Sequence, residues 1–309
     1  MPLINQLNNV FCIDTHMFGF PQYMSCYLIK GKELALVDTG MADKLDYVLA
    51  GIKNHGFSVE DITHVFVSHC EHPDHAGNVA PILELAPKAK AYINPVGLKN
   101  LLDPSIQHKE RMATLPERMW KRFQLPKPTP RDRIILLEDG QVIDLGDNVK
   151  LKSVFTPAHQ PSGYVLFDLK NDGLFINDLG GIYLADCGYS IILQPPDSAF
   201  FHEYEYLKKL IQNPPSHLYI GHYGIVENGP EHIRRALTRM EWMIDTGKKC
   251  LAEGHPEKIA ELIHARNQQE AEKLMKRDSK ELYEFASTEL IPPQARNFTR
   301  TFLNKFANS

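Results

Sequence analysis

Six side chains that can bind a metal ion or carry a proton lie within seven consecutive residues of this sequence. The stretch from His69 to His75 holds three histidines, two carboxylates and a thiol, and it closely follows the apolar run 65–67. Neutral imidazole and carboxylate oxygen are the usual protein ligands of zinc and of non-haem iron. One histidine here would favour an ordinary solvated loop. Three histidines and an aspartate at the end of a buried strand predict a metal site.

Three further predicted strands end in side chains of the same kinds. Residues 149–155 lead to His159, residues 174–177 lead to Asp178, and residues 218–220 lead to His222. Loops at one end of the sheet in α/β folds converge on a common site. Such a site has enough ligands for two metal ions about 3.5–4 Å apart. The eight candidate metal ligands are His69, Glu71, His72, Asp74, His75, His159, Asp178 and His222.

The elements that must position these residues follow an α/β pattern. Apolar runs predict strands at 8–13, 24–30, 34–37, 65–67 and 90–93, with helices at about 43–55 and 79–86 between the later ones. Short strands separated by Asp, Asn and Gly turns follow at 134–137, 141–144, 149–155, 163–168 and 173–177. Asp38-Thr39-Gly40 and Asp178-Leu179-Gly180 both end a buried strand, and this echo suggests two mixed sheets that face each other with helices outside.

Together these segments resemble the metallo-β-lactamase superfamily over roughly residues 8–226. The resemblance rests on His69, on His72-Pro73-Asp74-His75, on Thr156-Pro157-Ala158-His159, on Asp178 and on Gly221-His222, which occur in the family's order and context. It implies an α/β fold, an αββα sandwich of two mixed sheets. It also implies that Asp38 lies in the family's turn behind the metal ligands.

The ligand stretch departs from the family pattern by one residue. The family has one residue between its first two histidines, whereas Cys70 and Glu71 both separate His69 from His72. We favour a bulge in which His69 and His72 bind and Glu71 points away. The second alternative is His69 with Glu71, as in the family's di-iron oxygen-binding branch. Cys70 as a ligand is the third.

The resemblance also implies roles and a function. His69, His72 (or Glu71) and His159 would hold one metal ion, and Asp178 would bridge it to a second ion held by the remaining three ligands, Asp74, His75 and His222. Asp74 would be catalytic, orienting the attacking hydroxide and passing its proton to the leaving group. A tyrosine would donate a hydrogen bond to the oxyanion, with Tyr183, Tyr189 and Tyr223 as candidates.

We therefore expect a hydrolase that uses two divalent metal ions and acts on an ester, a thioester or a lactone. We expect both ions to be zinc. The alternative is a di-iron oxygen-binding or redox protein without a flavin domain, which the extra hard carboxylate of Glu71 favours. A catalytically silent binding module is the least favoured interpretation.

The bulk composition limits the partners. The 309 residues carry a net charge of −4, which gives no basic field for nucleic acid. No apolar run is long enough for a membrane span, and residues 1–6 have neither the basic nor the apolar stretch of a signal peptide, so we expect none. Five scattered cysteines form no disulfide framework. We expect a cytoplasmic protein with a small-molecule substrate.

Two regions lie outside the ligand pattern. Residues 97–133 contain five prolines and a helical piece at 116–123, and they are expected to form an insertion over the site. We expect residues 1–230 to form the metallo-β-lactamase-like domain and residues 231–309 a helical C-terminal extension, with helices at 230–246, 257–278, 279–288 and 293–306. The extension would form a lid or a homodimer surface. Neither region has a pattern that identifies the substrate.

Overall fold

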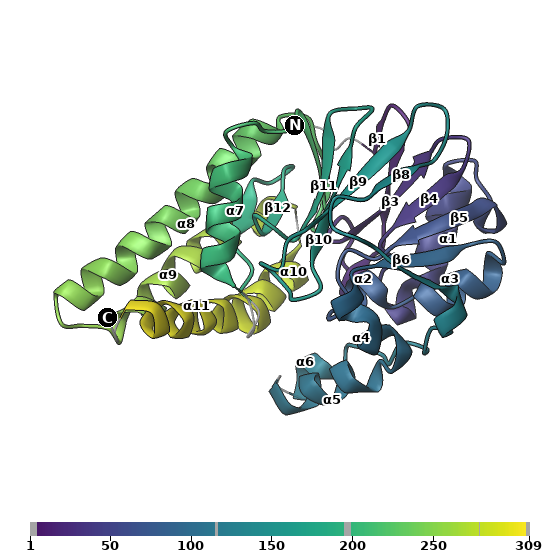
Figure 1. The fold of residues 1–309 in the computed structure, drawn as a ribbon. Helices are drawn as coiled ribbons and strands as arrows, with labels where there is room; N and C mark the ends of the chain where they lie inside the picture. Colours follow the sequence, from purple (N-terminus) through teal and green to yellow (C-terminus); the bar gives the residue numbers. More distant parts are fainter. Residues whose placement is uncertain (1–4, 115–116, 195–198, 278, 307–309) are drawn as a thin grey trace.

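Two mixed β-sheets face each other in the computed structural model, which describes residues 5–114, 117–194, 199–277 and 279–306. The first sheet has the strand order β1-β2-β3-β4-β5-β6-β7 and the second has the order β15-β14-β11-β10-β9-β8. Helices cover the outer face of each sheet, so that four layers result (Figure 1). The predicted αββα sandwich is confirmed.

The first sheet is built from the N-terminal half of the chain. Strands β1 to β4 pair antiparallel, and β4 to β7 pair parallel. Their bounds are Gln6–Leu7, Val10–Asp14, Ser25–Lys30, Leu34–Val37, Ile62–Phe66, Lys90–Ile93 and Ile134–Leu136 for β1 to β7. Helices α1 (Leu45–Asn54) and α3 (Val79–Leu85) pack on the outer face.

The apolar runs of this sheet are continuous because both faces are buried. In β3, Tyr27 and Ile29 point into the core between the sheets, whereas Cys26 and Leu28 point toward the helices. This alternation follows from the two-residue period of a strand. It explains why these strands were predictable from the sequence.

The second sheet is mostly antiparallel, with β11 and β14 as its parallel pair. Its strands are β8 (Val142–Asp144), β9 (Lys150–Phe155), β10 (Tyr164–Asp168), β11 (Gly173–Asn177), β14 (His217–Ile220) and β15 (Gly224–Val226). A separate hairpin, β12 (Ile182–Leu184) with β13 (Tyr189–Ile191), was not predicted, and neither was helix α7 (Phe200–Leu210).

The C-terminal helices form the outer layer of the second sheet. Helix α8 (Gly229–Ala252) is longer than the predicted 230–246, and α9 spans Lys258–Ala271 before a 3-10 helix at Glu272–Arg277. Helix α10 (Lys280–Phe285) and a π-helix (Ala286–Leu290) lead into α11 (Ile291–Phe306). Residue 278, the end of one predicted helix, lies outside the described residues. Phe298 and Phe302 of α11 share a core with Leu174 and Ile220 of the second sheet.

The proline-rich segment 97–133 folds as α4 (Leu98–Leu102), α5 (Ser105–Thr114) and α6 (Glu117–Trp120). Of the helix predicted at 116–123, α6 covers the middle, and residue 116 lies outside the described residues. Helices α5 and α6 project below the sheets in Figure 1. The segment is thus an excursion from the first sheet, between β6 and β7.

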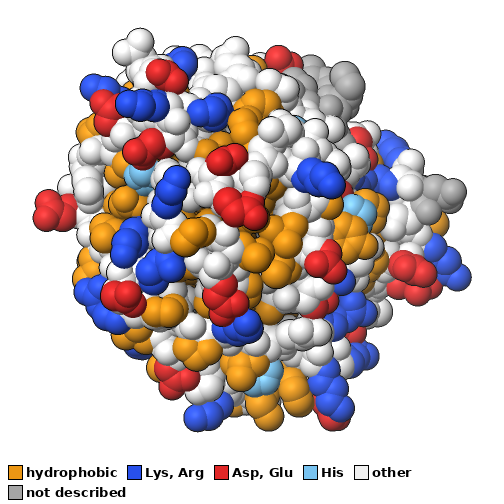
Figure 2. Space-filling view, turned by 90° about the vertical axis from the view of Figure 1, so that its right-hand side faces the viewer, with side chains coloured by type: hydrophobic (Ala, Val, Ile, Leu, Met, Phe, Trp, Pro, Cys, Tyr) orange, Lys and Arg blue, Asp and Glu red, His pale blue; other side chains and the backbone are white. Residues whose placement is uncertain are grey.

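The distribution of charged side chains on the surface agrees with the small net charge of the sequence. On the side that carries α1 and α3, Figure 2 shows acidic and basic side chains intermixed rather than gathered by sign. Within the described part of the chain, no helix is both long enough and apolar enough to cross a membrane.

Candidate metal centre

The ends of four strands meet at one edge of the sandwich. The loop after β5 and the short helix α2 (Pro73–Ala76) carry the histidine-rich stretch. His159 follows β9, Asp178 follows β11 and His222 follows β14. The sheet topology therefore brings together residues that are far apart in the sequence.

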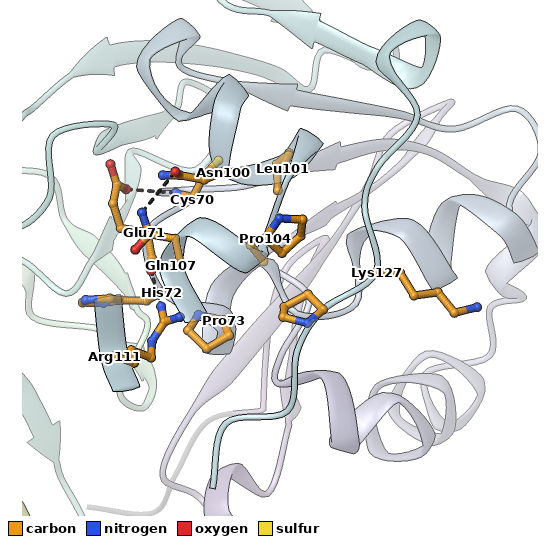
Figure 3. A pocket seen from close by; sticks show the side chains of 12 residues that line it. Cys70, Glu71, His72, Pro73, Asn100, Leu101, Pro104, Gln107, Arg111 and Lys127 are labelled. Atoms are coloured by element: carbon orange, nitrogen blue, oxygen red, sulfur yellow. Dashed lines mark hydrogen bonds between the residues drawn. The ribbon is translucent and has the colours of Figure 1, made fainter. Parts of the chain in front are cut away.

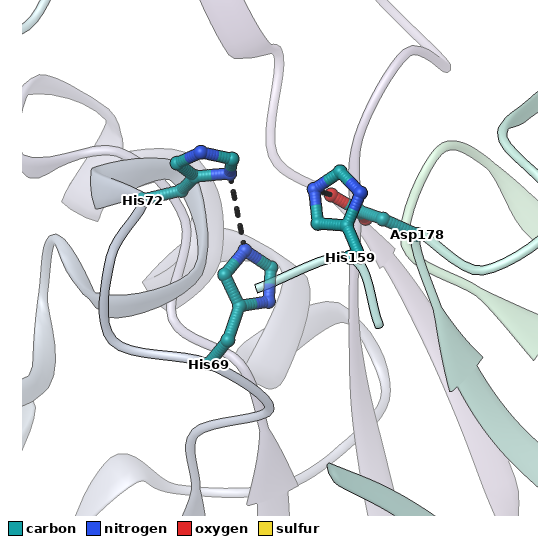
Figure 4. A group of neighbouring side chains, drawn as sticks. All are labelled: His69, His72, His159 and Asp178. Atoms are coloured by element: carbon teal, nitrogen blue, oxygen red, sulfur yellow. Dashed lines mark hydrogen bonds and ion pairs between the residues drawn. The ribbon is translucent and has the colours of Figure 1, made fainter. Parts of the chain in front are cut away.

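Seven of the eight candidate ligands form two compact groups. Within each group the potential ligand atoms all lie within 4.8 Å of one another. Figure 4 shows the side chains of the first group converging from three loops. The first group is His69, His72, His159 and Asp178, and the second is Asp74, His75 and His222.

Asp178 spans the two groups. Its Oδ2 lies 3.1 Å from His159 Nε2, and its Oδ1 lies 3.3 Å from His75 Nε2. The same Oδ1 is 3.8 Å from His222 Nε2. One carboxylate thus faces histidines of both groups, which is the position that a bridging ligand needs.

The donor atoms of the centre fit metal cations. Among the described residues, His75 Nε2, both ring nitrogens of His159 and Asp178 Oδ1 are buried without a hydrogen-bond partner. Leaving a buried polar atom unpaired costs about 1–3 kcal/mol. A metal ion at each group would satisfy His75 Nε2, Asp178 Oδ1 and one ring nitrogen of His159, which are ligands of the kind that zinc and iron take.

The protonation states of His69 and His72 suit metal binding, whereas His75 must release a proton to bind a metal ion. Burial and the neighbouring histidines lower the pKa of His69, and burial lowers the pKa of His72 to about 3. Both rings are therefore neutral, as a ligand must be. Burial opposes charge on Asp178, but the adjacent histidines outweigh it and lower its pKa. For His75, burial is outweighed by Asp178, Asp38 and Asp74, which raise its pKa.

Residues behind the ligands fix their orientation. Asp38 Oδ2 lies 2.8 Å from His75 Nδ1, and its carboxylate also accepts hydrogen bonds from the Ser68 N–H and hydroxyl, both at 2.9 Å. His222 Nδ1 lies 3.0 Å from the carbonyl oxygen of Tyr23. With Nδ1 engaged, Nε2 of each ring is directed into the centre.

Gly221 has no room for a side chain. A Cβ there would lie 2.7 Å from Asp178 Oδ1 and 3.2 Å from a ring carbon of His75. The glycine before His222 therefore allows the β14 loop to approach the centre closely.

Glu71 does not join either group. Its carboxylate accepts hydrogen bonds from the Cys70 N–H at 3.1 Å, the Ser162 N–H at 3.0 Å and the Ser162 hydroxyl at 2.5 Å. Figure 3 shows Glu71 and His72 pointing in different directions from the same loop. His72 Nδ1 instead lies 3.1 Å from His69 Nε2. This is the geometry of the first of the three arrangements, the bulge.

Cys70 also lies outside the two groups. Its thiol is buried against Gly97, where an added Cβ would be 2.6 Å from the sulfur. Burial, with the charges of Glu71 and Asp38, raises the pKa of this thiol. The thiol therefore packs against Gly97 and belongs to neither group of potential ligands.

Sequence reasoning missed two residues at the centre. The Tyr23 ring contacts His222 at 5.7 Å between centroids, and burial with the charges of Asp74 and Asp178 raises the pKa of its phenol. Arg111 of α5 contacts the ligand loop. Neither follows a strand end, so no pattern marked them.

The three tyrosines proposed from the sequence have other surroundings. Tyr183 packs against His232 with a centroid separation of 5.1 Å. Tyr223 lies beside Cys12, and Tyr189 is fully buried in β13.

The sequence profile of the metallo-beta-lactamase superfamily matches residues 20–222. Sequence relatives include flavo-diiron protein FprA2 of Clostridium acetobutylicum, 39% identical over 80 residues, which are 25% of this chain and 20% of that protein. Diflavin flavoprotein A 1 of a Synechocystis species is 28% identical over 181 residues, 57% of this chain and 27% of the relative. The chain thus corresponds to only about a quarter of the length of these relatives.

Among solved structures, a metallo-beta-lactamase family protein of Thermus thermophilus has a TM-score of 0.67 at 15% identity. The match covers 98% of this chain and 94% of that chain. It therefore includes the C-terminal helices as well as the sandwich.

Proposed function

This chain belongs to the metallo-β-lactamase superfamily, and from that premise we propose that it is a hydrolase that uses two divalent metal ions. His69, His72 and His159 would hold one ion, and Asp74, His75 and His222 the other, with Asp178 between them. The observation that carries the proposal is the position of Glu71. Because Ser162 engages its carboxylate, a histidine completes the first group, and zinc suits this histidine-rich set.

Bound zinc ions would supply Lewis acidity toward a substrate carbonyl and lower the pKa of water toward neutrality. The chain's own residues supply the rest. The carboxylate of Asp74, 3.6 Å from His222 Nε2, would orient the attacking water, accept its proton and pass that proton to the leaving group. The phenol of Tyr23 stays protonated at neutral pH and would donate a hydrogen bond to a substrate oxygen. Esters, thioesters and lactones are the substrates that this arrangement suits.

A di-iron redox protein is the second candidate, and the similarity to a flavo-diiron protein supports it. In that case Glu71 would leave Ser162 and take the place of His72 as a ligand. Three hydrogen bonds to its carboxylate oppose that exchange, so we favour the hydrolase.

The proposal is tested by loading metal-free protein with zinc and assaying a carboxylic ester, a thioester and a lactone. We expect turnover of at least one class, and its loss on chelation. The variant His159→Ala is expected to bind fewer than two ions, whereas His255→Ala, a change of an exposed histidine, is expected to keep both. Two ions retained in His159→Ala, or no turnover of any class, would contradict the proposal.

A further inference from the structure

Helix α5 of the excursion between β6 and β7 places Arg111 against the ligand loop. Its Nη2 donates a hydrogen bond to the carbonyl oxygen of Glu71, the residue before His72. The guanidinium also lies 5.4 Å from the ring centroid of Phe123. Arg111 and His72 line the same small cavity, and Figure 3 shows the two side chains close together there.

The positive charge of Arg111 acts on the metal centre. Burial lowers its pKa to about 10 and Asp74 opposes that effect, so the group is a cation at neutral pH. The same charge contributes to the lowered pKa of His72. The hydrogen bond to the Glu71 carbonyl and the shared cavity place this guanidinium beside His72.

The hydrogen bond from Arg111 to Glu71 does not neutralise the positive charge of the guanidinium. It uses a neutral carbonyl, while the carboxylate of Glu71 is turned to Ser162. A guanidinium has five N–H donors in a planar fork that matches a carboxylate. A partly buried cation in this position is suited to receive an anionic group from a ligand.

Aromatic rings continue from Arg111 along the same side. Phe123, which contacts Arg111, has its ring centroid 5.2 Å from that of Phe18, and Phe18 lies 5.3 Å from Phe285 of α10. Phe18 and Phe123 are only partly buried. An ion pair of 2.6 Å between Arg118 and Glu289 joins the excursion to the C-terminal helices beside these rings. The guanidinium of Arg122 lies 5.6 Å from the ring centroid of Phe18 and 5.3 Å from that of Phe285. The three segments thus place aromatic rings and a second cation next to Arg111.

We infer that Arg111 is a specificity-determining residue that binds a carboxylate group of the substrate. The substrate would be an acyl compound with its scissile carbonyl at the metal centre, its carboxylate on Arg111 and its apolar part on Phe18 and Phe123. The expected effect of Arg111 on hydrolysis rests on the proposed hydrolase function. The binding of the carboxylate alone does not depend on that function.

The test compares an anionic and a neutral ligand of similar length. The kinetic probes are mono-4-nitrophenyl adipate and 4-nitrophenyl hexanoate, and the binding probes are adipate and the uncharged hexanamide, titrated calorimetrically into zinc-loaded protein. Loss of a charged hydrogen bond predicts that Arg111→Gln lowers kcat/KM for the anionic ester and the affinity for adipate by about 10- to 100-fold. The values for the neutral ester and hexanamide should change less than about threefold. Arg111→Lys, which keeps the charge without the fork, should fall between.

Lys121→Gln is the matched control, because it removes an exposed positive charge from the same excursion. It should change neither kcat/KM for the two esters nor the affinity for the two binding probes. Equal losses for both ligands in Arg111→Gln, or no loss for either, would overturn the inference. So would loss of zinc from Arg111→Gln with zinc kept in Arg111→Lys, since Arg111 would then only hold the loop. If the wild type hydrolyses neither ester, adipate binding alone decides the inference, and the thioester and lactone assays decide the proposed function.

Discussion

The carboxylate of Glu71 joins two of the three loops that carry the first group of ligands. It binds the N–H and the hydroxyl of Ser162, in the loop of His159, and the N–H of Cys70, in the loop of His69. The Cys70 N–H also donates a hydrogen bond to the Ser162 hydroxyl oxygen, at 2.9 Å. The extra residue in the ligand stretch thus works as a clamp between loops in this structure.

Removing the clamp should weaken metal binding without removing a ligand. We expect Glu71→Ala to lower zinc affinity by about 10- to 100-fold, as is typical when a group behind a ligand is lost, while two ions still bind at saturation. Glu71→Gln should lose less, because the amide oxygen can still accept from Ser162. Competition with a chromogenic chelator measures both variants.

The control for the clamp is Glu84→Ala, which removes an exposed carboxylate paired with Lys127 and should leave zinc affinity unchanged. A saturating stoichiometry of one ion in Glu71→Ala would show instead that Glu71 is a ligand. That result would shift the account toward the di-iron alternative.

Residue types decided how much of the site was predictable. Histidine and aspartate at strand ends were found because few other side chains bind these metals. The direction of Glu71 could not be derived, since a bulge and a ligand exchange both fit one extra residue. Tyr23 and Arg111 could not be found either, because their positions depend on packing between distant segments.

At the scale of elements, most strands of the two large sheets were predictable, including the three-residue β7 and β8 that turn residues mark, whereas the separate hairpin was not. The strands β12 and β13 are too short for alternation to show. In α7 the buried stripe Phe200, Glu203 and Leu207 includes a charged residue, which hides the apolar period. Glu203 accepts a hydrogen bond from the Gly180 N–H at 2.8 Å, and burial raises its pKa to about 7.

The division of the chain at residue 230 remains a prediction, and the packing of α11 provides its test. Phe302 is fully buried and lies against Gly247 of α8, where a Cβ would be 2.6 Å from the ring. Because this core also contains second-sheet residues, we expect Phe302→Ala to destabilise the whole chain by about 3–5 kcal/mol in one unfolding transition. Denaturant unfolding followed by circular dichroism and by tryptophan fluorescence measures this.

Asn304→Ala, an exposed change on the same helix, should be close to neutral. Two separate transitions, with only the first shifted by Phe302→Ala, would mean instead that residues 231–309 unfold as an independent extension.

At the scale of the whole molecule, the sandwich sets the position of the centre, and the excursion contacts the ligand loop through Arg111. The excursion 97–133 supplies Arg111 and Phe123, and the C-terminal helices supply Phe285, which approaches the same side through Phe18. The sequence predicted the sandwich from its strand pattern. It could not predict that these two segments meet, because their contacts are few, aromatic and distant in the chain.

The central claim is that the centre holds two zinc ions for hydrolysis rather than iron for redox chemistry. The direct measurement is the metal content of the protein, expressed without added metal and purified in air, together with its absorption spectrum. We predict two zinc ions per chain and no absorption band beyond the protein's own ultraviolet absorption, because zinc has a filled d shell. Two iron ions per chain with a near-ultraviolet or visible band would contradict the account.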